Sequence, residues 1–147
     1  MNDNNFAGEW LEIAHENYDA ADFLYKTMRP KPLGIVLGHC QDAVAAALKG
    51  YLSAAGLETP NSGDAAKLCR HCAGSDHAFD YLMDDCKKLD RRANGTRYPP
   101  CMRVTGAQAE RALSQTFALY GYVSERVNEI LTAERQSGPL GHDGPGM

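Results

Sequence analysis

Two groups of polar side chains in this sequence are of the kinds that bind phosphates and nucleobases. One lies inside the apolar stretch LGIVLGHCQDAVAAALKGYL, residues 33–52, and the other in a basic segment from Lys87 to Arg103. Guanidinium groups bind phosphate, and a tyrosine ring can stack on a base. The candidate ligand-binding residues are therefore Arg97, Tyr98, Arg103, Arg91, Arg92, His39, Gln41 and Lys49.

Two interpretations of His39 and Gln41 stay open at this stage. Both residues lie in an otherwise apolar helical pattern, so they can satisfy hydrogen bonds in the core or at a dimer interface. Alternatively, they line a groove that also receives Arg97 and Tyr98 from the basic segment.

A Cys-x-x-Cys motif, Cys69 to Cys72, raises the question of zinc, with His77 nearby. Zinc needs four ligands, and no second Cys-x-x-Cys or His pair follows at the spacing of a zinc finger. We therefore predict no metal site and no cofactor. The number of cysteines is five, an odd number, and we expect buried thiols rather than a disulfide framework.

Gly74-Ser75 and the later Asp84-Asp85 imitate the active-site signature of nucleotidyltransferases. That chemistry places its carboxylates on strands, where they share a magnesium ion, whereas the intervening residues here have a helical period. A phosphate-binding glycine loop, a nucleophile elbow and a His-Glu-x-x-His helix are all missing from the sequence. We therefore do not predict an enzyme of these classes.

Charge is unevenly distributed, although the net charge is only −4. Residues 1–24 contain six acidic residues and neither Lys nor Arg, while residues 87–103 contain six basic residues and Asp90. The two segments can face each other, within a subunit or across a dimer. Alternatively, the basic segment is a patch that binds phosphate or RNA.

Apolar residues recur at steps of three and four throughout, which predicts an all-α protein. We expect an up-and-down helical bundle of four long or medium helices plus one short helix, in one domain over residues 6–133. The Gly/Pro-rich residues 134–147 are expected to be disordered. The predicted helices span about residues 6–28, 33–55, 64–73, 76–89 and 105–133, with an irregular basic loop over residues 90–105.

The helix ends and inner faces can also be predicted. Asn4 or Asn5, Ser75 or Asp76, and Thr105 are expected N-caps, and Gly56 is an expected left-handed stop of the second helix. The predicted inner faces include Ile13 in the first helix and Phe117 in the last. No apolar run reaches the roughly 18 residues of a membrane span, and the acidic start is not a targeting signal, so we expect a cytoplasmic protein.

The central stretch resembles the second helix of HEPN domains. The similar residues are His39-Cys40-Gln41, Ala43, Ala46, Leu48-Lys49, Tyr51-Leu52 and Gly56. Trp10 in a long first helix and Arg97-Tyr98-Pro99 before the last helix are similar too. The resemblance implies an all-α bundle that usually forms a homodimer and is associated with nucleotide or RNA binding. It also implies a possible partner, a minimal nucleotidyltransferase, sometimes in a toxin–antitoxin pair.

Many members of this family are metal-independent ribonucleases with an Arg-x4–6-His motif near the start of the last helix. Here no histidine follows Arg97 and Arg103 until His142. Arg70 and His77 have an acceptable spacing, but they precede the basic segment, so they are weak catalytic candidates. Within the motif of the second helix, Asp42 replaces a glutamine and Ala45 stands where Lys or Glu is usual.

The sequence therefore favours a non-catalytic HEPN-like domain that binds a nucleotide, RNA or a partner protein. Two alternatives remain. One is a ribonuclease that uses Arg70 and His77, and the other is a purely structural dimerisation or interaction module.

Overall fold

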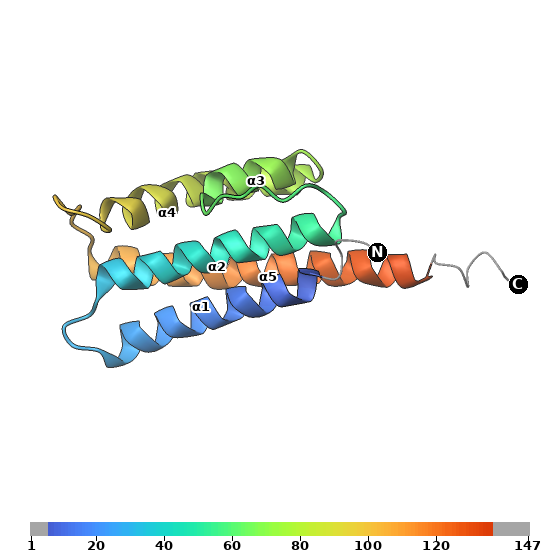
Figure 1. Ribbon diagram of the computed structural model, residues 1–147. Coiled ribbons are helices and arrows are strands. Elements are labelled where there is room, and N and C mark those ends of the chain that lie inside the picture. The colour runs from blue at the N-terminus through green and yellow to red at the C-terminus, as the bar shows by residue number, and fades with distance from the viewer. Residues whose placement is uncertain (1–5, 137–147) are drawn as a thin grey trace, which may run out of the picture.

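The computed structural model describes residues 6–136, and these form helices and connections without a strand (Figure 1). The predicted all-α bundle is confirmed. Within the described residues, no helix is long and apolar enough to cross a membrane. The elements are α1 (Ala7–Thr27), α2 (Leu33–Ala54), α3 (Ala65–Ala73), the 3₁₀ helix η2 (His77–Leu82), α4 (Met83–Gly95) and α5 (Gly106–Gln136).

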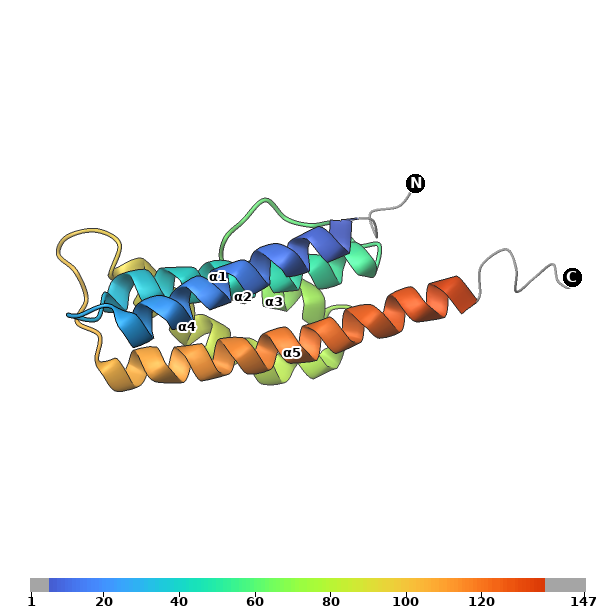
Figure 2. The same cartoon turned by 90° about the horizontal axis from the view of Figure 1, so that it is seen from below.

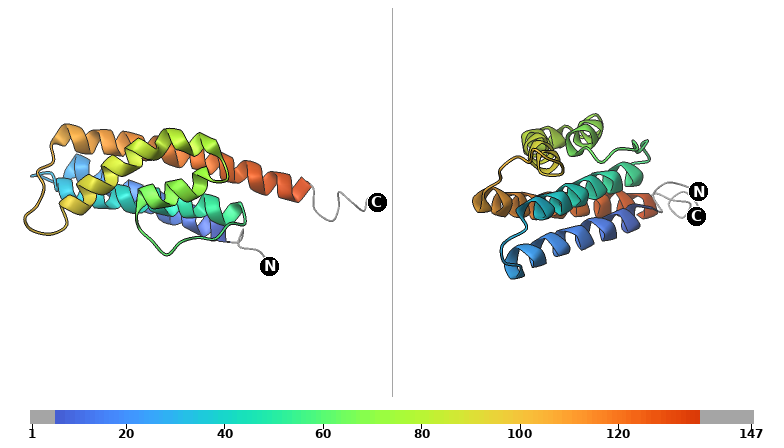
Figure 3. Two further views of the ribbon diagram at one scale, coloured as in Figure 1. Left: turned by 90° about the horizontal axis from the view of Figure 1, so that it is seen from above. Right: turned by 60° about the vertical axis from the view of Figure 1, so that its left-hand side comes forward.

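Helix α2 is the centre of the bundle. It lies between α1 and α5 on one side and the layer of α3 and α4 on the other (Figures 1 and 3). Small residues allow these neighbours to approach closely. At Gly50, for example, an added Cβ would lie 3.3 Å from the Cβ of Trp10 on α1. The longest helix, α5, extends beyond the other helices at its C-terminal end (Figure 2).

Three of the predicted helix ends have the expected hydrogen bonds. Gly56 has a φ of +72°, and the N–H of Leu57 donates to the carbonyl of Leu52 at 2.9 Å. This is the pattern of a left-handed helix stop. At the start of α5, Thr105 and Gln108 each accept a bond from the other's backbone N–H at 3.1 Å, which is a capping box.

At the start of η2, Asp76 accepts a bond from the N–H of Ala78 at 3.0 Å, as an N-cap does. The predicted caps of the first helix, Asn4 and Asn5, lie outside the described residues. From residue 137 onward, the predicted disordered tail also lies outside the described residues.

The predicted irregular loop over residues 90–105 is wrong in its first third. Helix α4 continues to Gly95, so Arg91 and Arg92 lie on a helix. The reason is burial: Leu89, Asp90 and Ala93 continue the inward face of α4 against the core. Helix α5 also runs to Gln136, three residues beyond its predicted end at Ala133.

Two residues predicted to lie on inner faces are exposed. Ile13 on α1 is 43% exposed and Phe117 on α5 is 61% exposed. Helix α1 instead contacts the core through Ala7, Ala14 and Ala21, which are fully buried. Because small side chains bring α1 close to α2, the large residues beside them are displaced to the edge of the contact.

Candidate ligand-binding site

The segment after α4 and the first turns of α2 lie at the end of the bundle that also carries the α1–α2 connection (Figures 1 and 2). A groove opens between them. We call it the first groove, and its volume is about 480 Å³. That volume lies within the range of small-molecule sites. Its walls are Pro32, Leu33, Gly34, Ile35, Gly38, His39, Asp42, Thr96, Arg97 and Tyr98.

Two glycines of α2 let the 96–98 segment lie close to the helix. A Cβ added at Gly34 would lie 3.1 Å from the Cβ of Thr96, which is tighter than an ordinary contact. A Cβ added at Gly38 would lie 3.8 Å from Nη1 of Arg97, an ordinary van der Waals distance. The glycine face of α2 therefore determines where Thr96 and Arg97 sit.

A buried amide holds the guanidinium of Arg97. Gln41 is only 3% exposed, and its Oε1 accepts a hydrogen bond from Nη2 of Arg97. Its Nε2 donates to Asp90 Oδ1 at 2.9 Å and to Asn94 Oδ1 at 3.2 Å. Both ends of the amide are thus used by protein groups, so Gln41 positions Arg97 rather than facing a ligand.

Asp90 connects this network to α3. Its two carboxylate oxygens accept the backbone N–H groups of Ala65 and Ala66 at 2.9 and 2.8 Å. These N–H groups belong to the first turn of α3, where helical acceptors are missing, so Asp90 serves as the cap of that helix. Burial and the neighbouring carboxyl of Asp64 raise the pKa of Asp90.

A second hollow, of about 360 Å³, opens beside the first groove. The two share Asp42 and Arg97, so the Arg97 side chain borders both. We call it the second groove, and it is lined by Gln41, Asp42, Ser62, Gly63, Asp64, Asn94 and Arg97.

His39 and Tyr98 complete the first groove. Nδ1 of His39 lies 2.9 Å from Oδ1 of Asn17 on α1, which fixes the ring and leaves Nε2 as the atom free of that contact. Tyr98 is 77% exposed. The structure therefore brings His39, Arg97 and Tyr98 into one groove with an imidazole, a guanidinium and an aromatic ring.

Comparison with known families decides which family this fold represents. Residues 7–127 match the family model of the HEPN domain. The chain belongs to the HEPN domain family. This membership connects the chain with nucleotide- or RNA-related functions or interactions. Comparisons with curated proteins and with solved structures gave no match.

Other predicted binding residues lie elsewhere in this HEPN domain. Lys49 lies ten residues after His39 along α2, which is roughly 15 Å along a helix axis. Its Nζ lies 5.0 Å from the ring centroid of Trp10, so it makes a cation–π contact outside the grooves. Arg91 and Arg103 are exposed and line neither groove.

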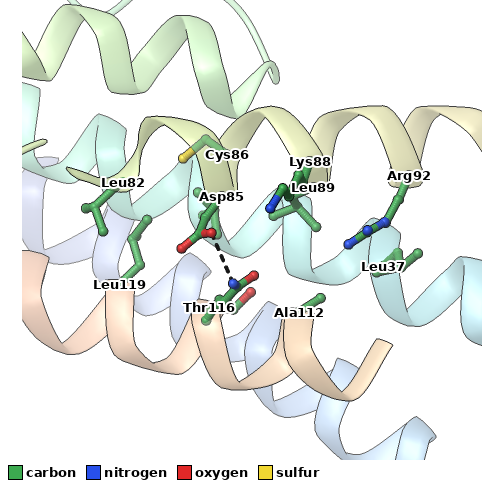
Figure 4. Close-up of a pocket in the computed structure, with 12 residues that line it drawn as sticks. Leu37, Leu82, Asp85, Cys86, Lys88, Leu89, Arg92, Ala112, Thr116 and Leu119 are labelled. Atoms are coloured by element: carbon green, nitrogen blue, oxygen red, sulfur yellow. Dashed lines mark hydrogen bonds between the residues drawn. The ribbon is translucent and has the colours of Figure 1, made fainter. Parts of the chain in front are cut away.

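Arg92 lines a different space, a small cavity between α2, α4 and α5 (Figure 4). The cavity has a volume of about 30 Å³ and is mostly apolar, with Leu37 and Leu119 among its walls. Beside it, Gln115 Nε2 donates to Asp85 Oδ1 at 3.1 Å. A space of this size holds no more than a few water molecules. It is too small for a nucleotide.

The weak catalytic candidates, Arg70 and His77, are not part of either groove. The His77 side chain is 92% exposed, and its Nδ1 lies 3.4 Å from Asp80. It stands at the start of η2, whereas Arg97 follows the end of α4, so the length of η2 and α4 separates them. Arg70 is exposed on α3.

The cysteines contribute no site either. Four of the five are buried, and the exposed one is Cys101, contrary to the prediction that all are buried. Cys69 donates to the carbonyl of Phe79, and burial raises the pKa of Cys40 to about 11. Within residues 6–136, no group of His, Cys, Asp or Glu side chains could hold a metal ion.

Sequence reasoning missed Asp90, Asn94, Ser62 and Asp64, which shape the second groove and its network. Asp90 had a weak signal, since it is the single acidic residue of the basic segment. Asn94, Ser62 and Asp64 had no such signal in the sequence, because their role depends on which turn of α2 they lie beside.

Proposed function

We propose that this HEPN domain is a non-catalytic module that binds a nucleotide-containing ligand, RNA in particular, in the first groove. The observation that carries the proposal is the guanidinium of Arg97, held by the buried Gln41 beside the exposed ring of Tyr98. A guanidinium has five N–H donors. Among the described residues, only Gln41 accepts from that of Arg97, so the remaining donors can serve a phosphate.

The surroundings of Arg97 support a phosphate at this place. The first turn of α2 lines the groove. The N–H groups of Leu33 and Val36 donate to Lys31 and Pro32, which leaves those of Gly34 and Ile35 as the first-turn groups without a helical acceptor. Such groups favour anions. Tyr98 stands next to Arg97 with most of its ring exposed, where a base can stack on it. A phosphate at Arg97 and a base on Tyr98 together describe one nucleotide.

A binding role fits the groove better than cleavage does. Metal-free cleavage of RNA needs a base for the 2′-hydroxyl and an acid for the leaving oxygen. The groove lining holds one imidazole, His39, and the Arg70 and His77 pair lies outside it. The homodimer, the nucleotidyltransferase-type partner and the toxin–antitoxin context implied by the family stay predictions.

The experiment is a fluorescence-anisotropy titration of a labelled, mixed-sequence single-stranded RNA, without metal and at low salt. We expect Arg97→Ala to weaken binding about tenfold or more, because a charge-assisted hydrogen bond is lost. Tyr98→Ala should weaken it at least about fivefold through lost stacking. Unchanged affinity in both variants would refute the proposed site.

A matched control exists for each variant. Tyr81 is also an exposed tyrosine, at 89%, but lies on η2 away from the grooves, so Tyr81→Ala should bind as the unmodified protein does. Arg135→Ala, in the last turn of α5, controls for the loss of one positive charge. The same samples run on a gel should show intact RNA. Cleavage that disappears in His77→Ala would establish the ribonuclease alternative instead.

A further inference from the structure

The second groove has a different chemistry from the first, although Arg97 borders both. Its lining lacks aromatic and aliphatic side chains. Besides Gln41 and Arg97, its polar groups are the carboxylates of Asp42 and Asp64, the hydroxyl of Ser62 and the amide of Asn94. Asp42 and Asp64 are exposed. Carboxylates accept hydrogen bonds, and Asp64 lines only this groove, so this groove is better suited than the first to a group that donates hydrogen bonds.

Two of the acceptors in this groove, Ser62 and Asn94, have hydrogen bonds within the protein. Ser62 Oγ accepts the backbone N–H of Asp64 at 3.0 Å, which orders the 62–64 turn at the start of α3. Oδ1 of Asn94 accepts from the buried Gln41 at 3.2 Å. A hydrogen bond with Asp90 lowers the pKa of Asp64, so Asp64 is ionised at neutral pH. The groove therefore presents two exposed carboxylates beside two hydrogen-bonded groups, Ser62 and Asn94.

We propose that the second groove is a base-binding subsite that selects nucleobases carrying an exocyclic amino group, and that it takes the nucleotide next to the one in the first groove. An amino group donates to the carboxylates of Asp42 and Asp64. Single-stranded RNA presents such base edges freely, because its bases are not paired. The ligand of the domain is then a single-stranded step of two nucleotides.

Arg97 explains why the two grooves act together. It forms the boundary between them, so a chain that passes from one to the other brings its phosphodiester to this guanidinium. The first base stacks on Tyr98, where every base is tolerated, because stacking needs only a π face. The second base contacts the hydrogen-bond acceptors of the second groove, so this groove can select between nucleobases. This inference rests on the proposed function, since it needs a nucleotide in the first groove.

Cytosine and uracil make the sharpest probe of this subsite. The two pyrimidines have the same ring size, but cytosine carries an amino donor where uracil carries a carbonyl acceptor. We would measure the affinities of the dinucleotides CpC and UpU, and of CMP and UMP, by calorimetry with the purified full chain. We expect CpC to bind about tenfold more tightly than UpU, while CMP and UMP measure the affinity of a single nucleotide.

Asp64→Ala tests the subsite without touching the first groove, whose walls do not include this residue. In this variant the affinity for CpC should fall to that for UpU, with UpU unchanged or tighter. Glu125→Ala, an exposed acid on α5, is the control for loss of one negative charge and should keep the preference.

The outcomes separate the two proposals. Equal binding of CpC and UpU, or tighter binding of UpU, to the unmodified protein overturns the subsite and leaves the proposed function standing. A preference for CpC that survives in Asp64→Ala also overturns it. If no nucleotide or dinucleotide binds at all, the proposed function fails, and the subsite fails with it.

Discussion

At the scale of single residues, Gln41 is the side chain on which the candidate site depends. It is a buried amide within an apolar helix, and the unpaired burial of such a group would be costly. Its oxygen accepts from Arg97 and its nitrogen donates to Asp90 and Asn94, so the group is satisfied. A network of this kind fixes one arrangement of the groups it joins.

We predict that Gln41→Ala lowers the free energy of unfolding by about 2–3 kcal/mol, because Asp90 loses a donor while it remains buried. The same variant should weaken RNA binding, since Arg97 is no longer held. Urea denaturation checks the first effect and anisotropy the second. His39→Ala, at a partly exposed position of the same helix, should cost less stability. Full stability in Gln41→Ala would show that the network does not hold the fold.

At the scale of elements, the glycine face of α2 determines how the 96–98 segment approaches. Gly34 and Gly38 lie one helical turn apart, and Thr96 and Arg97 cover them. The two positions differ in how much space an added methyl group would find. The close approach of Thr96 to Gly34 offers a test of whether ligand binding depends on the placement of the 96–98 segment.

We predict that Gly34→Ala weakens RNA binding about tenfold, because its Cβ would press on Thr96 and displace Arg97. Gly121→Ala is the matched control, since it lies on α5 outside both grooves, its Cβ would meet no atom within 4 Å and the helix propensity gained is the same. Anisotropy titrations of both variants measure the effect. Equal RNA affinities of the two variants would show that binding does not depend on the position of the 96–98 segment.

At the scale of the whole molecule, a contact of Asp76 joins the layer of α3 and α4 to α5. Nε and Nη2 of Arg126 both lie 3.0 Å from Oδ2 of Asp76, while Oδ1 accepts the N–H of Ala78. That N–H and Arg126 both lower the pKa of Asp76. In contrast, inside one subunit α1 and residues 87–103 form no ion pair in the described part of the chain.

This contact predicts a pH dependence. Because the folded pKa of Asp76 lies below its unfolded value of about 3.9, its stabilisation is present above about pH 4 and is lost as the pH falls through the folded pKa. Asp76→Asn keeps the acceptor for Ala78 but removes the charge. Thermal melts from pH 2 to 7 should show a smaller loss at low pH for this variant. Parallel curves for the two proteins would contradict the assignment.

Much of this fold could be predicted from the sequence, because its signals are local. The apolar spacing in residues 33–52, the Thr105 cap and the Gly56 stop depend on hydrogen bonds and side chains within a few positions. The resemblance of the second helix also led to the HEPN family, which the match over residues 7–127 shows. The predictions that Phe117 is buried and that Arg91 lies in a loop were wrong, since burial depends on neighbours from other elements.

The sequence by itself determined the all-α fold, the helix ends at Gly56, Asp76 and Thr105 and the family, whereas only the tertiary structure decided the candidate site. Gln41 meets Arg97 across 56 positions and Asp90 across 49, so no local pattern could pair them. The same holds for the second groove, whose walls come from α2, the 62–64 turn and α4. The physical reason is that a helix end is closed by its own neighbours in the chain, while a groove exists only where separate helices pack.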